Sequence, residues 1–387
     1  MRAARVSRVA KTGKEIMLVV GEASGDAHGA QLVEALLDRD PNVKVFGVAG
    51  EHLEQTHFEM LFSVSKLTGM GLAELAGNLS NVWQGYRLLR RALRERRPNL
   101  LVLIDFPEFN LRLAKLAKGL KIPVLYYVSP QVWAWRRYRV RQIARWVDRM
   151  AVIFPFEVPF YERYGVKVTF VGHPLLDSVR AQQPRETFLA KLGLNPGKTT
   201  VALLPGSRRR EVAYHLPVML DAADRLRRER DIQFMCVRAS TIEKQQLTSV
   251  IAGEAKQIPI VENDRYDAVN AADLVWTASG TATVETALLL KPMIIVYRLS
   301  WLTYYLARLL VHVDHVGMAN LMASERVVPE LIQSEFNADR IVRESQVILD
   351  DRQIRSTIVA KWLELRKRLG CAGAANRVAD LAFAMMA

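Results

Sequence analysis

The chain has 387 residues, of which half are hydrophobic and 24% are charged, and it carries a formal net charge of +14. This length suits two domains of ordinary size, and the hydrophobic share excludes a disordered or fibrous protein. Its two cysteines, Cys236 and Cys371, have no paired spacing, which excludes a disulfide framework or a cysteine-based zinc site and favours a cytoplasmic location. The positive charge predicts attraction to polyanions: nucleic acid, acidic lipid headgroups or phosphorylated small molecules.

Two segments bear on membrane association. Residues 1–14 are basic and lack an apolar core, so they predict a disordered arm rather than a signal peptide. The stretch 301–313 is apolar, but it is shorter than the roughly 18 residues that a spanning helix needs, and it contains Arg308 and His312. We therefore expect a protein that is soluble or lies on a membrane surface, without crossing it.

Residues 15–180 alternate between short β-branched runs and amphipathic patterns, which indicates a parallel sheet covered by helices. A polar stretch at 182–184 predicts a linker, and the same alternation resumes over 181–365. The residues from 338 to 386 are helical in pattern, and we expect 366–387 to pack on the first domain or on a partner. The predicted fold class is α/β, with two Rossmann-like doubly wound domains whose strand carboxyl ends face a cleft. The predicted strands are 16–20, 43–48, 100–104, 124–128, 150–154, 168–171, 201–204, 233–237, 274–277 and 293–296.

Two segments of the first domain carry candidate catalytic and ligand-binding residues. The sequence GEASGDAHG, residues 21–29, joins a strand to a helix through a glycine-rich turn, where free backbone N–H groups bind anions. Ser24, Gly25 and Asp26 are candidates for contacts to such a ligand, which the family resemblance given below implies to be the acceptor, although Ser24 also suits a turn and Asp26 a helix N-cap. Asp105 ends a strand at the mouth of the predicted cleft and is the candidate general base. Its alternative role is to cap the helix that follows.

Aromatic residues of the first domain give two further features. Trp133 and Trp135 lie in the loop sequence SPQVWAWR, where they can wall a sugar-binding or apolar site or pack in the core. A helical pattern over 72–95 has an apolar face and an arginine-rich end, which is typical of a core helix or of an interfacial helix on anionic lipid. That face comprises Leu72, Leu75, Leu79, Trp83 and Tyr86.

The second domain contains two strand-to-helix turns suited to phosphate. Residues 204–211 (LPGSRRRE) offer a glycine, a helix amino end and guanidinium groups, and residues 277–285 (TASGTATVE) offer small hydroxyl-bearing residues at a helix start. Two such turns in one sheet indicate a nucleotide diphosphate. Glu285 suits ribose hydroxyls, or it is a solvated glutamate at a helix start. The candidate nucleotide-binding residues here, which the family resemblance given below implies to bind the donor, are Ser207, Arg208, Glu211, Ser279, Gly280, Thr281 and Glu285.

Metal-binding signals are weak. Asp38 and Asp40 have a D-x-D spacing but lie at a helix end before a proline, which favours a solvated turn. His312, Asp314 and His315 have no further ligand-type residues near them in sequence. We predict no metal and no cofactor.

An ordered set of motifs resembles the lipid-A-disaccharide synthase family. The resemblance extends from about residue 15 to the last helix and implies the glycosyltransferase-B fold, with an acceptor domain at 15–180 and a donor domain at 181–365. It implies that UDP-2,3-diacylglucosamine is joined to 2,3-diacylglucosamine 1-phosphate in the lipid A pathway of Gram-negative bacteria, with inversion and without a metal, at the inner membrane. The motifs are GEASGDAHG (21–29), LTGMG (67–71), SPQVWAWR (129–136), LPGSRRRE (204–211), ASGTATVE (278–285) and NLMA (320–323).

Residue roles follow from the resemblance. Asp105 is implied as the base for the acceptor 6-hydroxyl, Arg208 and residues 279–281 as the diphosphate site, and Glu285 and Asn320 as contacts to UDP. Ala319 stands where the family often has proline, which makes the role of Asn320 less secure. The implied partners are the two acylated sugars and an anionic membrane surface, without nucleic acid, and a homodimer stays open. The resemblance also favours membrane contact by Leu72, Leu75, Leu79 and Trp83. The alternative is a nucleotide-sugar epimerase or a soluble glycosyltransferase of the same fold.

Overall fold

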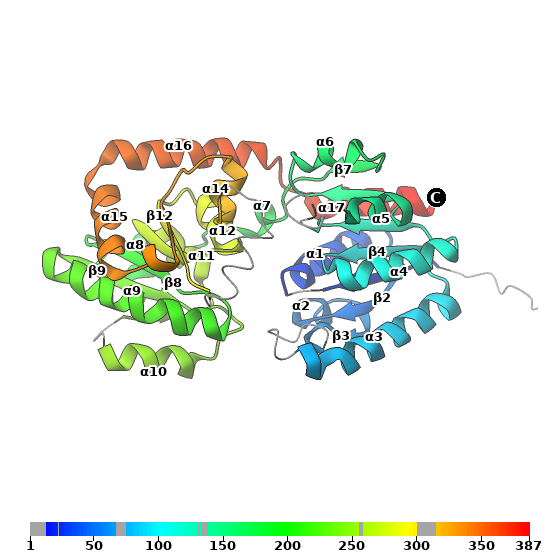
Figure 1. Ribbon diagram of the computed structural model, residues 1–387, viewed down its shortest axis with the longest axis horizontal. Helices are drawn as coiled ribbons and strands as arrows, with labels where there is room; N and C mark the ends of the chain where they lie inside the picture. The colour runs from blue at the N-terminus through cyan, green and yellow to red at the C-terminus, as the bar shows by residue number, and fades with distance from the viewer. Residues whose placement is uncertain are drawn as a thin grey trace, which may run out of the picture. The chain divides into compact units, whose positions relative to one another are not determined.

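The computed structural model describes residues 13–21, 23–66, 75–130, 132, 138–254, 258–299 and 315–387. The chain forms two compact units. Unit 1 comprises Met1–Pro174 together with Leu369–Ala387, and unit 2 comprises Leu175–Arg368. The chain therefore passes into unit 2 after Pro174 and returns to unit 1 for its last residues (Figure 1).

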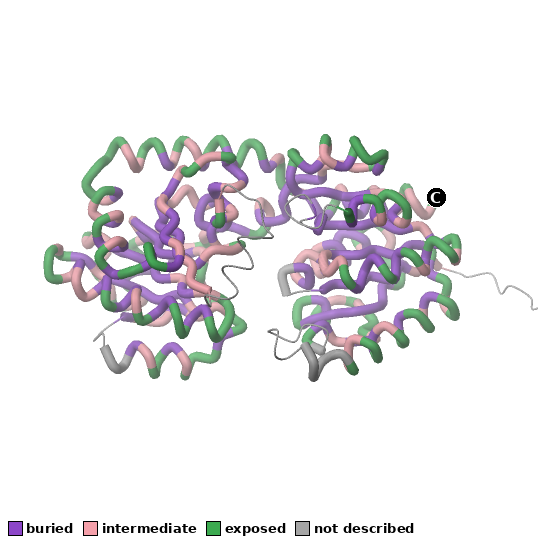
Figure 2. The backbone as a smooth tube through the Cα atoms, in the orientation of Figure 1, coloured by how far each residue is buried: buried purple, intermediate pink, exposed green. Residues whose placement is uncertain are grey.

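Unit 1 is built on a parallel seven-stranded sheet with the order β3-β2-β1-β4-β5-β6-β7. Its central strands are continuously apolar because helices cover both faces, and every residue of β4 is buried (Figure 2). The order reverses between β1 and β4, which is the switch point where ligands of such sheets bind. The strands are β1 (Glu15–Val20), β2 (Lys44–Ala49), β3 (Phe58–Ser63), β4 (Leu100–Ile104), β5 (Val124–Tyr127), β6 (Arg149–Val152) and β7 (Val168–Phe170).

The helices of unit 1 connect these strands, and the last one comes from the end of the chain. Helix α17 packs on α1, where Arg39 Nε bonds to Asp380 at 2.7 Å and Arg39 Nη1 to Asn376 at 3.0 Å. The helices are α1 (Ala23–Arg39), α2 (Glu51–Glu54), the 3-10 helix η1 (Val64–Lys66), α3 (Leu75–Arg96), α4 (Pro107–Gly119), α5 (Arg139–Trp146), α6 (Glu157–Glu162) and α17 (Ala374–Met386).

Unit 2 repeats the architecture with a parallel six-stranded sheet of order β10-β9-β8-β11-β12-β13. Leu204 at the end of β8 pairs in register with Thr277 of β11, so the turns that follow these two strands are neighbours at one edge of the sheet. The strands are β8 (Thr199–Leu204), β9 (Ile232–Val237), β10 (Ile260–Val261), β11 (Leu274–Ala278), β12 (Met293–Tyr297) and β13 (Glu330–Ile332).

Helices cover this second sheet, and α15 packs on α9 while α16 contacts α12 (Figure 1). The stretch 182–184, predicted as a linker, is part of unit 2, where the backbone N–H groups of Gln182 and Gln183 donate to Asp267 Oδ1 at 2.5 and 3.0 Å. The helices are α7 (Leu175–Ser178), α8 (Arg185–Lys191), α9 (Arg209–Glu229), α10 (Lys244–Glu254), α11 (Arg265–Ala271), α12 (Thr281–Leu288), α14 (Met318–Ala323), the 3-10 helix η2 (Gln333–Glu335), α15 (Ala338–Asp350) and α16 (Arg352–Arg368).

The sequence-based element prediction missed strands at the sheet edges. The residues of β3 are mostly exposed or half-buried, and β10 and β13 are two and three residues long, so they lack the apolar run that identified the central strands. The helical tail is also interrupted, because Gly370 and Gly373 adopt left-handed backbone conformations with φ of 89° and 91° between α16 and α17.

Candidate active site

Three left-handed non-glycine residues of unit 1 lie at the carboxyl ends of β4 and β5. Asp105 and Phe106 have φ of 51° and 46°, and Val128 has φ of 60°. The last residues of the two strands, Ile104 and Tyr127, pair in register, so these positions lie at one edge of the sheet. A left-handed conformation costs a non-glycine residue about 1–3 kcal/mol, and such strain clusters at functional sites. This edge is therefore the candidate catalytic edge of unit 1.

Hydrogen bonds from buried side chains hold the left-handed pair Asp105 and Phe106, which we call the Asp105 corner. The Tyr126 hydroxyl donates to the Asp105 carbonyl at 2.5 Å, and Asn110 Nδ2 donates to the same carbonyl at 2.7 Å and to the Ile104 carbonyl at 3.1 Å. Gly21 makes room, because a Cβ there would lie 2.1 Å from Phe106 Cβ. The N-cap position of α4 is occupied by Phe106 rather than by Asp105.

The Asp105 carboxylate lies beside the amino end of α1. The position that a Cβ on Gly25 would occupy is 3.5 Å from Asp105 Oδ2, a van der Waals contact distance. Positive charge at a helix amino end stabilises a neighbouring carboxylate in its ionised form. The structure thus brings together Gly25 of the predicted acceptor turn and the predicted base.

Asp26 bonds to the start of a different helix from the one that the sequence suggests it caps. Its carboxylate is buried and accepts backbone N–H bonds from Gly50 at 2.7 Å, His52 at 2.8 Å and Leu53 at 3.4 Å. It therefore caps α2, a different helix from the one in which it lies, and ties the end of β2 to α1. The side chain of Ser24 lies outside the described residues, as do Trp133 and Trp135.

Two histidines near this edge were not identified from the sequence as site residues. The His28 ring lies 6.4 Å from the ring of Tyr127, and the His173 ring lies 5.3 Å from that of Phe154. Burial lowers the pKa of His28 to about 4 and that of His173 to about 3. Both rings are therefore neutral at pH 7. The only available signal was their place in GEASGDAHG and in the Gly-His-Pro turn after β7.

Trp83 is exposed and connects to the Asp105 corner through aromatic contacts. Its side chain is 51% exposed, it stacks on Tyr86 at 5.9 Å, and Tyr86 meets Phe109 edge-on at 6.0 Å. Phe109 in turn stacks on Phe106 at 5.6 Å. Leu72 lies outside the described residues, and Leu75 and Leu79 lie in the first turns of α3, where the structure does not describe the side chains.

In unit 2, Glu211 shapes the turn after β8. Its Oε2 accepts the backbone N–H groups of Ser207 at 3.0 Å and Arg208 at 3.3 Å, and its Oε1 accepts Arg208 Nη1 at 3.1 Å. Gly206 has φ of 128°, and a Cβ there would lie 2.6 Å from Glu211, so only glycine suits this turn. Glu211 is buried, whereas Ser207 and Arg208 are exposed at the amino end of α9. Ser207 and Arg208 are therefore the residues of this turn that can contact a ligand.

His215 was not identified from the sequence, and it joins the same turn to the end of β12. Its Nδ1 lies 2.8 Å from the Pro205 carbonyl, and the Arg298 backbone N–H donates to its Nε2 at 3.0 Å. The ring is fully buried, and desolvation lowers its pKa. These partners require a neutral ring that donates from Nδ1 and accepts at Nε2. His215 lies in the middle of α9, and its position in the sequence does not indicate that it joins these two segments.

The turn after β11 contains the second set of predicted donor residues. Ser279 and Gly280 are half-buried and Thr281 is exposed at the start of α12. The Ser279 hydroxyl donates to the Val316 carbonyl at 2.8 Å, and space next to Gly280 is open, since a Cβ there would meet nothing within 4 Å. Because β8 and β11 are neighbours, this turn lies beside the turn that carries Arg208.

Glu285 is buried rather than solvated, which corrects the alternative interpretation made from the sequence. Its Oε1 accepts hydrogen bonds from Arg265 and from the Tyr266 hydroxyl, the latter at 3.2 Å. Desolvation raises the pKa of Glu285, and the Arg265 charge opposes that rise. Neither of these two partners on α11 could be predicted from the sequence.

Asn320 is fully buried, and its side chain makes four hydrogen bonds within unit 2. Nδ2 donates to the Val328 carbonyl at 2.9 Å and to Glu330 Oε1 at 2.8 Å, and Oδ1 accepts the backbone N–H groups of Val327 at 3.0 Å and Val328 at 3.2 Å. The backbone N–H of Ala319 donates to Thr283 Oγ1 at 3.2 Å. Asn320 therefore organises the 315–330 segment beside the turn after β11.

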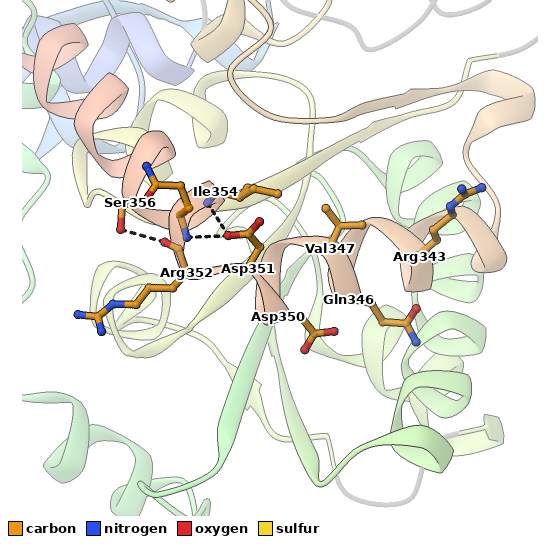
Figure 3. A pocket seen from close by; sticks show the side chains of 9 residues that line it. Arg343, Gln346, Val347, Asp350, Asp351, Arg352, Ile354 and Ser356 are labelled. Atoms are coloured by element: carbon orange, nitrogen blue, oxygen red, sulfur yellow. Dashed lines mark hydrogen bonds between the residues drawn. The ribbon is translucent and has the colours of Figure 1, made fainter.

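Other surface features do not involve the predicted site residues. An open hollow at the junction of α15 and α16 is lined by residues such as Arg343, Asp350 and Arg352, and none of the predicted site residues lines it (Figure 3). Within the described ranges, no cluster of three or more His, Cys, Asp or Glu side chains is arranged to hold a metal ion. His312 and Asp314 lie outside those ranges. Among the helices that the structure describes, none has the length and apolar character needed to cross a membrane.

Comparison with known proteins decides the family. The family model described as lipid-A-disaccharide synthetase matches residues 16–376. The chain belongs to the lipid-A-disaccharide synthase family. It is 44% identical to the lipid-A-disaccharide synthase of Geobacter sulfurreducens, covering 97% of this chain and 98% of the relative. It is 43% identical to that of Nitrosococcus oceani, covering 96% of each chain. The resemblance inferred from the six motifs is thereby confirmed.

Solved structures with the same fold include enzymes of different activity. A putative UDP-N-acetylglucosamine 2-epimerase from Listeria monocytogenes has a TM-score of 0.63 at 14% identity and covers 94% of each chain. The glycotransferase of kitacinnamycin also has a TM-score of 0.63 at 14% identity, over 97% of this chain and all of the other. These likenesses establish the glycosyltransferase-B fold alone. Family membership excludes the epimerase alternative, so this member of the synthase family is a glycosyltransferase of lipid A biosynthesis that uses nucleotide-sugar and sugar-phosphate substrates.

Proposed function

We propose that the chain transfers diacylglucosamine from UDP-2,3-diacylglucosamine to the 6-hydroxyl of 2,3-diacylglucosamine 1-phosphate, with inversion at the anomeric carbon. The acceptor oxygen forms a bond to C1 of the donor sugar while the bond from C1 to the UDP oxygen breaks. The hydroxyl proton passes to the Asp105 carboxylate, and UDP leaves with the bonding electron pair. The observation that carries this proposal is the strained corner that holds Asp105 at the carboxyl end of β4.

Unit 1 is assigned to the acceptor. The Asp105 carboxylate lies beside Gly25, so an acceptor hydroxyl that reaches the base also meets the amino end of α1. The backbone N–H groups of that first turn can bind an anionic or hydroxyl group of the sugar. Ser24, Trp133 and Trp135 stay in the proposal as acceptor contacts by virtue of the family motifs. Asp26 is assigned to the scaffold, because its carboxylate already caps α2.

Unit 2 is assigned to the donor. Ser207, Arg208 and the residues 279–281 are the exposed or half-buried members of two neighbouring turns, which suits contact with a diphosphate. The Arg208 guanidinium and the backbone N–H groups at the starts of α9 and α12 would stabilise the charge that develops on the departing UDP. Glu211 bonds to the turn after β8, Asn320 organises the segment beside the turn after β11, and Glu285 is the candidate for the ribose hydroxyls.

We further propose that α3 holds the enzyme on the inner membrane. Trp83 and Leu88 are 51% and 39% exposed, and they lie among the exposed arginines Arg87, Arg90, Arg91 and Arg94. Apolar side chains flanked by arginines suit a bilayer interface with anionic headgroups. Leu72, Leu75 and Leu79 extend the same proposed surface in sequence.

The deciding experiment is the substitution Asp105→Asn. We expect UDP release from the two acylated sugars to fall by about 10²-fold or more, a typical loss for a general base, while the Kd for UDP stays within twofold. The matched control is Glu108→Gln, a carboxylate three residues away that pairs with Arg139 at 2.7 Å, and it should retain most activity. Wild-type turnover by the Asp105→Asn enzyme would refute the assignment of the base. We expect turnover to be unchanged in excess EDTA, because the proposed reaction uses no metal ion, and a loss of turnover would contradict this.

A further inference from the structure

The Asp105 carbonyl is the meeting point of two buried donors from different elements. Tyr126 reaches it from β5 at 2.5 Å, and Asn110 reaches it from α4 at 2.7 Å. Both side chains are fully buried. A buried hydroxyl that lacked a partner would destabilise the fold, so a tyrosine in the middle of a buried strand needs a partner of this kind. A phenylalanine would fill the same space in β5 without one.

These bonds control where the Asp105 carboxylate points. Asp105 and Phe106 are both left-handed, a conformation that non-glycine residues leave unless the surroundings hold them. Ile104 is held in β4 on one side of the Asp105 Cα, and the bonded carbonyl holds the peptide on the other side, so the direction of the bond from Cα to Cβ is fixed. That direction places Oδ2 beside Gly25. Loss of one donor would let the corner relax and the carboxylate move, without altering any residue that touches the substrate.

We propose that Tyr126, assisted by Asn110, is a positioning residue that holds the general base in its reactive orientation. This inference rests on the proposed role of Asp105. Its effect is confined to the chemical step, because a misplaced base weakens proton transfer in the transition state and leaves ground-state binding in place. The donor-binding turns of unit 2 are unaffected.

The first measurement uses Tyr126→Phe. We expect kcat to fall about tenfold, with KM for both substrates and the Kd for UDP within twofold of wild type. The matched control is Tyr161→Phe, which removes another buried hydroxyl of unit 1, bonded to Ser129 at 2.5 Å, and should change kcat less than twofold. A Tyr126→Phe enzyme with unchanged kcat would overturn the proposal.

A double-mutant cycle separates positioning from general loss of packing. Tyr126→Phe should lower kcat in the wild-type background and should have no further effect in the Asp105→Asn background. Equal losses in the two backgrounds would overturn the positioning role while leaving Asp105 as the base. Full activity of Asp105→Asn alone would instead overturn the proposed function. If Tyr126→Phe fails to fold, Asn110→Ser replaces it in the same double-mutant cycle. The serine side chain is too short to donate to the Asp105 carbonyl, so this variant removes the second hydrogen bond to that carbonyl.

Discussion

Substitutions of Asn320 test whether this residue stabilises unit 2 or contacts the ligand. Its four hydrogen bonds lie inside unit 2, and its side chain is fully buried. Asn320→Ala removes all four and leaves buried partners unpaired. At about 0.5–1 kcal/mol for each of the three neutral bonds and about 1.5 kcal/mol for the one to Glu330, the expected loss is about 3–4.5 kcal/mol of unfolding free energy.

Asn320→Asp distinguishes a loop organiser from a ligand contact. The aspartate keeps the oxygen that accepts from Val327 and Val328, but its second oxygen faces the Val328 carbonyl and the buried Glu330 carboxylate. Two adjacent carboxylates repel each other unless one takes up a proton. We therefore expect this near-isosteric change to be at least as destabilising as Asn320→Ala.

The assay is differential scanning calorimetry without nucleotide. For a domain the size of unit 2, a loss of about 3 kcal/mol lowers Tm by roughly 6–12 °C. The matched control is Asn337→Asp, because Asn337 is an exposed N-cap that accepts from Arg340 N–H at 3.0 Å, and aspartate caps equally well. If Asn320→Asp kept the wild-type Tm and weakened UDP binding more than tenfold, Asn320 would contact the ligand and our reasoning would be refuted.

Three further outcomes are expected. Arg208→Ala should weaken UDP binding about tenfold or more by calorimetry, because a charge-assisted bond to the diphosphate is lost, and unchanged affinity would exclude that contact. His173 takes up a proton near its ordinary pKa when unfolded but only near pH 3 when folded, so acid favours unfolding. About 2 kcal/mol of unfolding free energy should be lost between pH 6.5 and 5, and His173→Gln should remove this part of the pH dependence of stability. An unchanged pH dependence in His173→Gln would mean that the ring is already protonated in the folded protein. Replacing Trp83 and Leu88 by serine should release the protein from anionic vesicles at unchanged Tm, whereas Leu363→Ser, equally exposed on α16, should not; equal release by both would contradict the α3 assignment.

The central strands and the strand-to-helix turns that carry the motifs could be predicted from the sequence alone. The residues of β4 are continuously apolar because both faces of a parallel sheet are covered, and this pattern is local. The turns at 21–29, 204–211 and 277–285 are likewise local, since a strand, small residues and a helix start follow one another in the chain. Their ordered occurrence was specific enough to indicate the family, which the comparisons confirm.

Tertiary structure decided which of the motif residues are exposed and which are buried supports. Asp26 caps α2 through residues 24 to 27 positions away, Asn320 bonds to Glu330, and His215 joins Pro205 to Arg298. The left-handed corner at Asp105 depends on Tyr126 from the neighbouring strand. A sequence pattern reports periodicity and residue type, whereas a hydrogen-bond partner is set by strand order and register. For that reason Asp105 could be proposed as the base from its place at a strand end, but the residues that bond to its backbone could be found only in the fold.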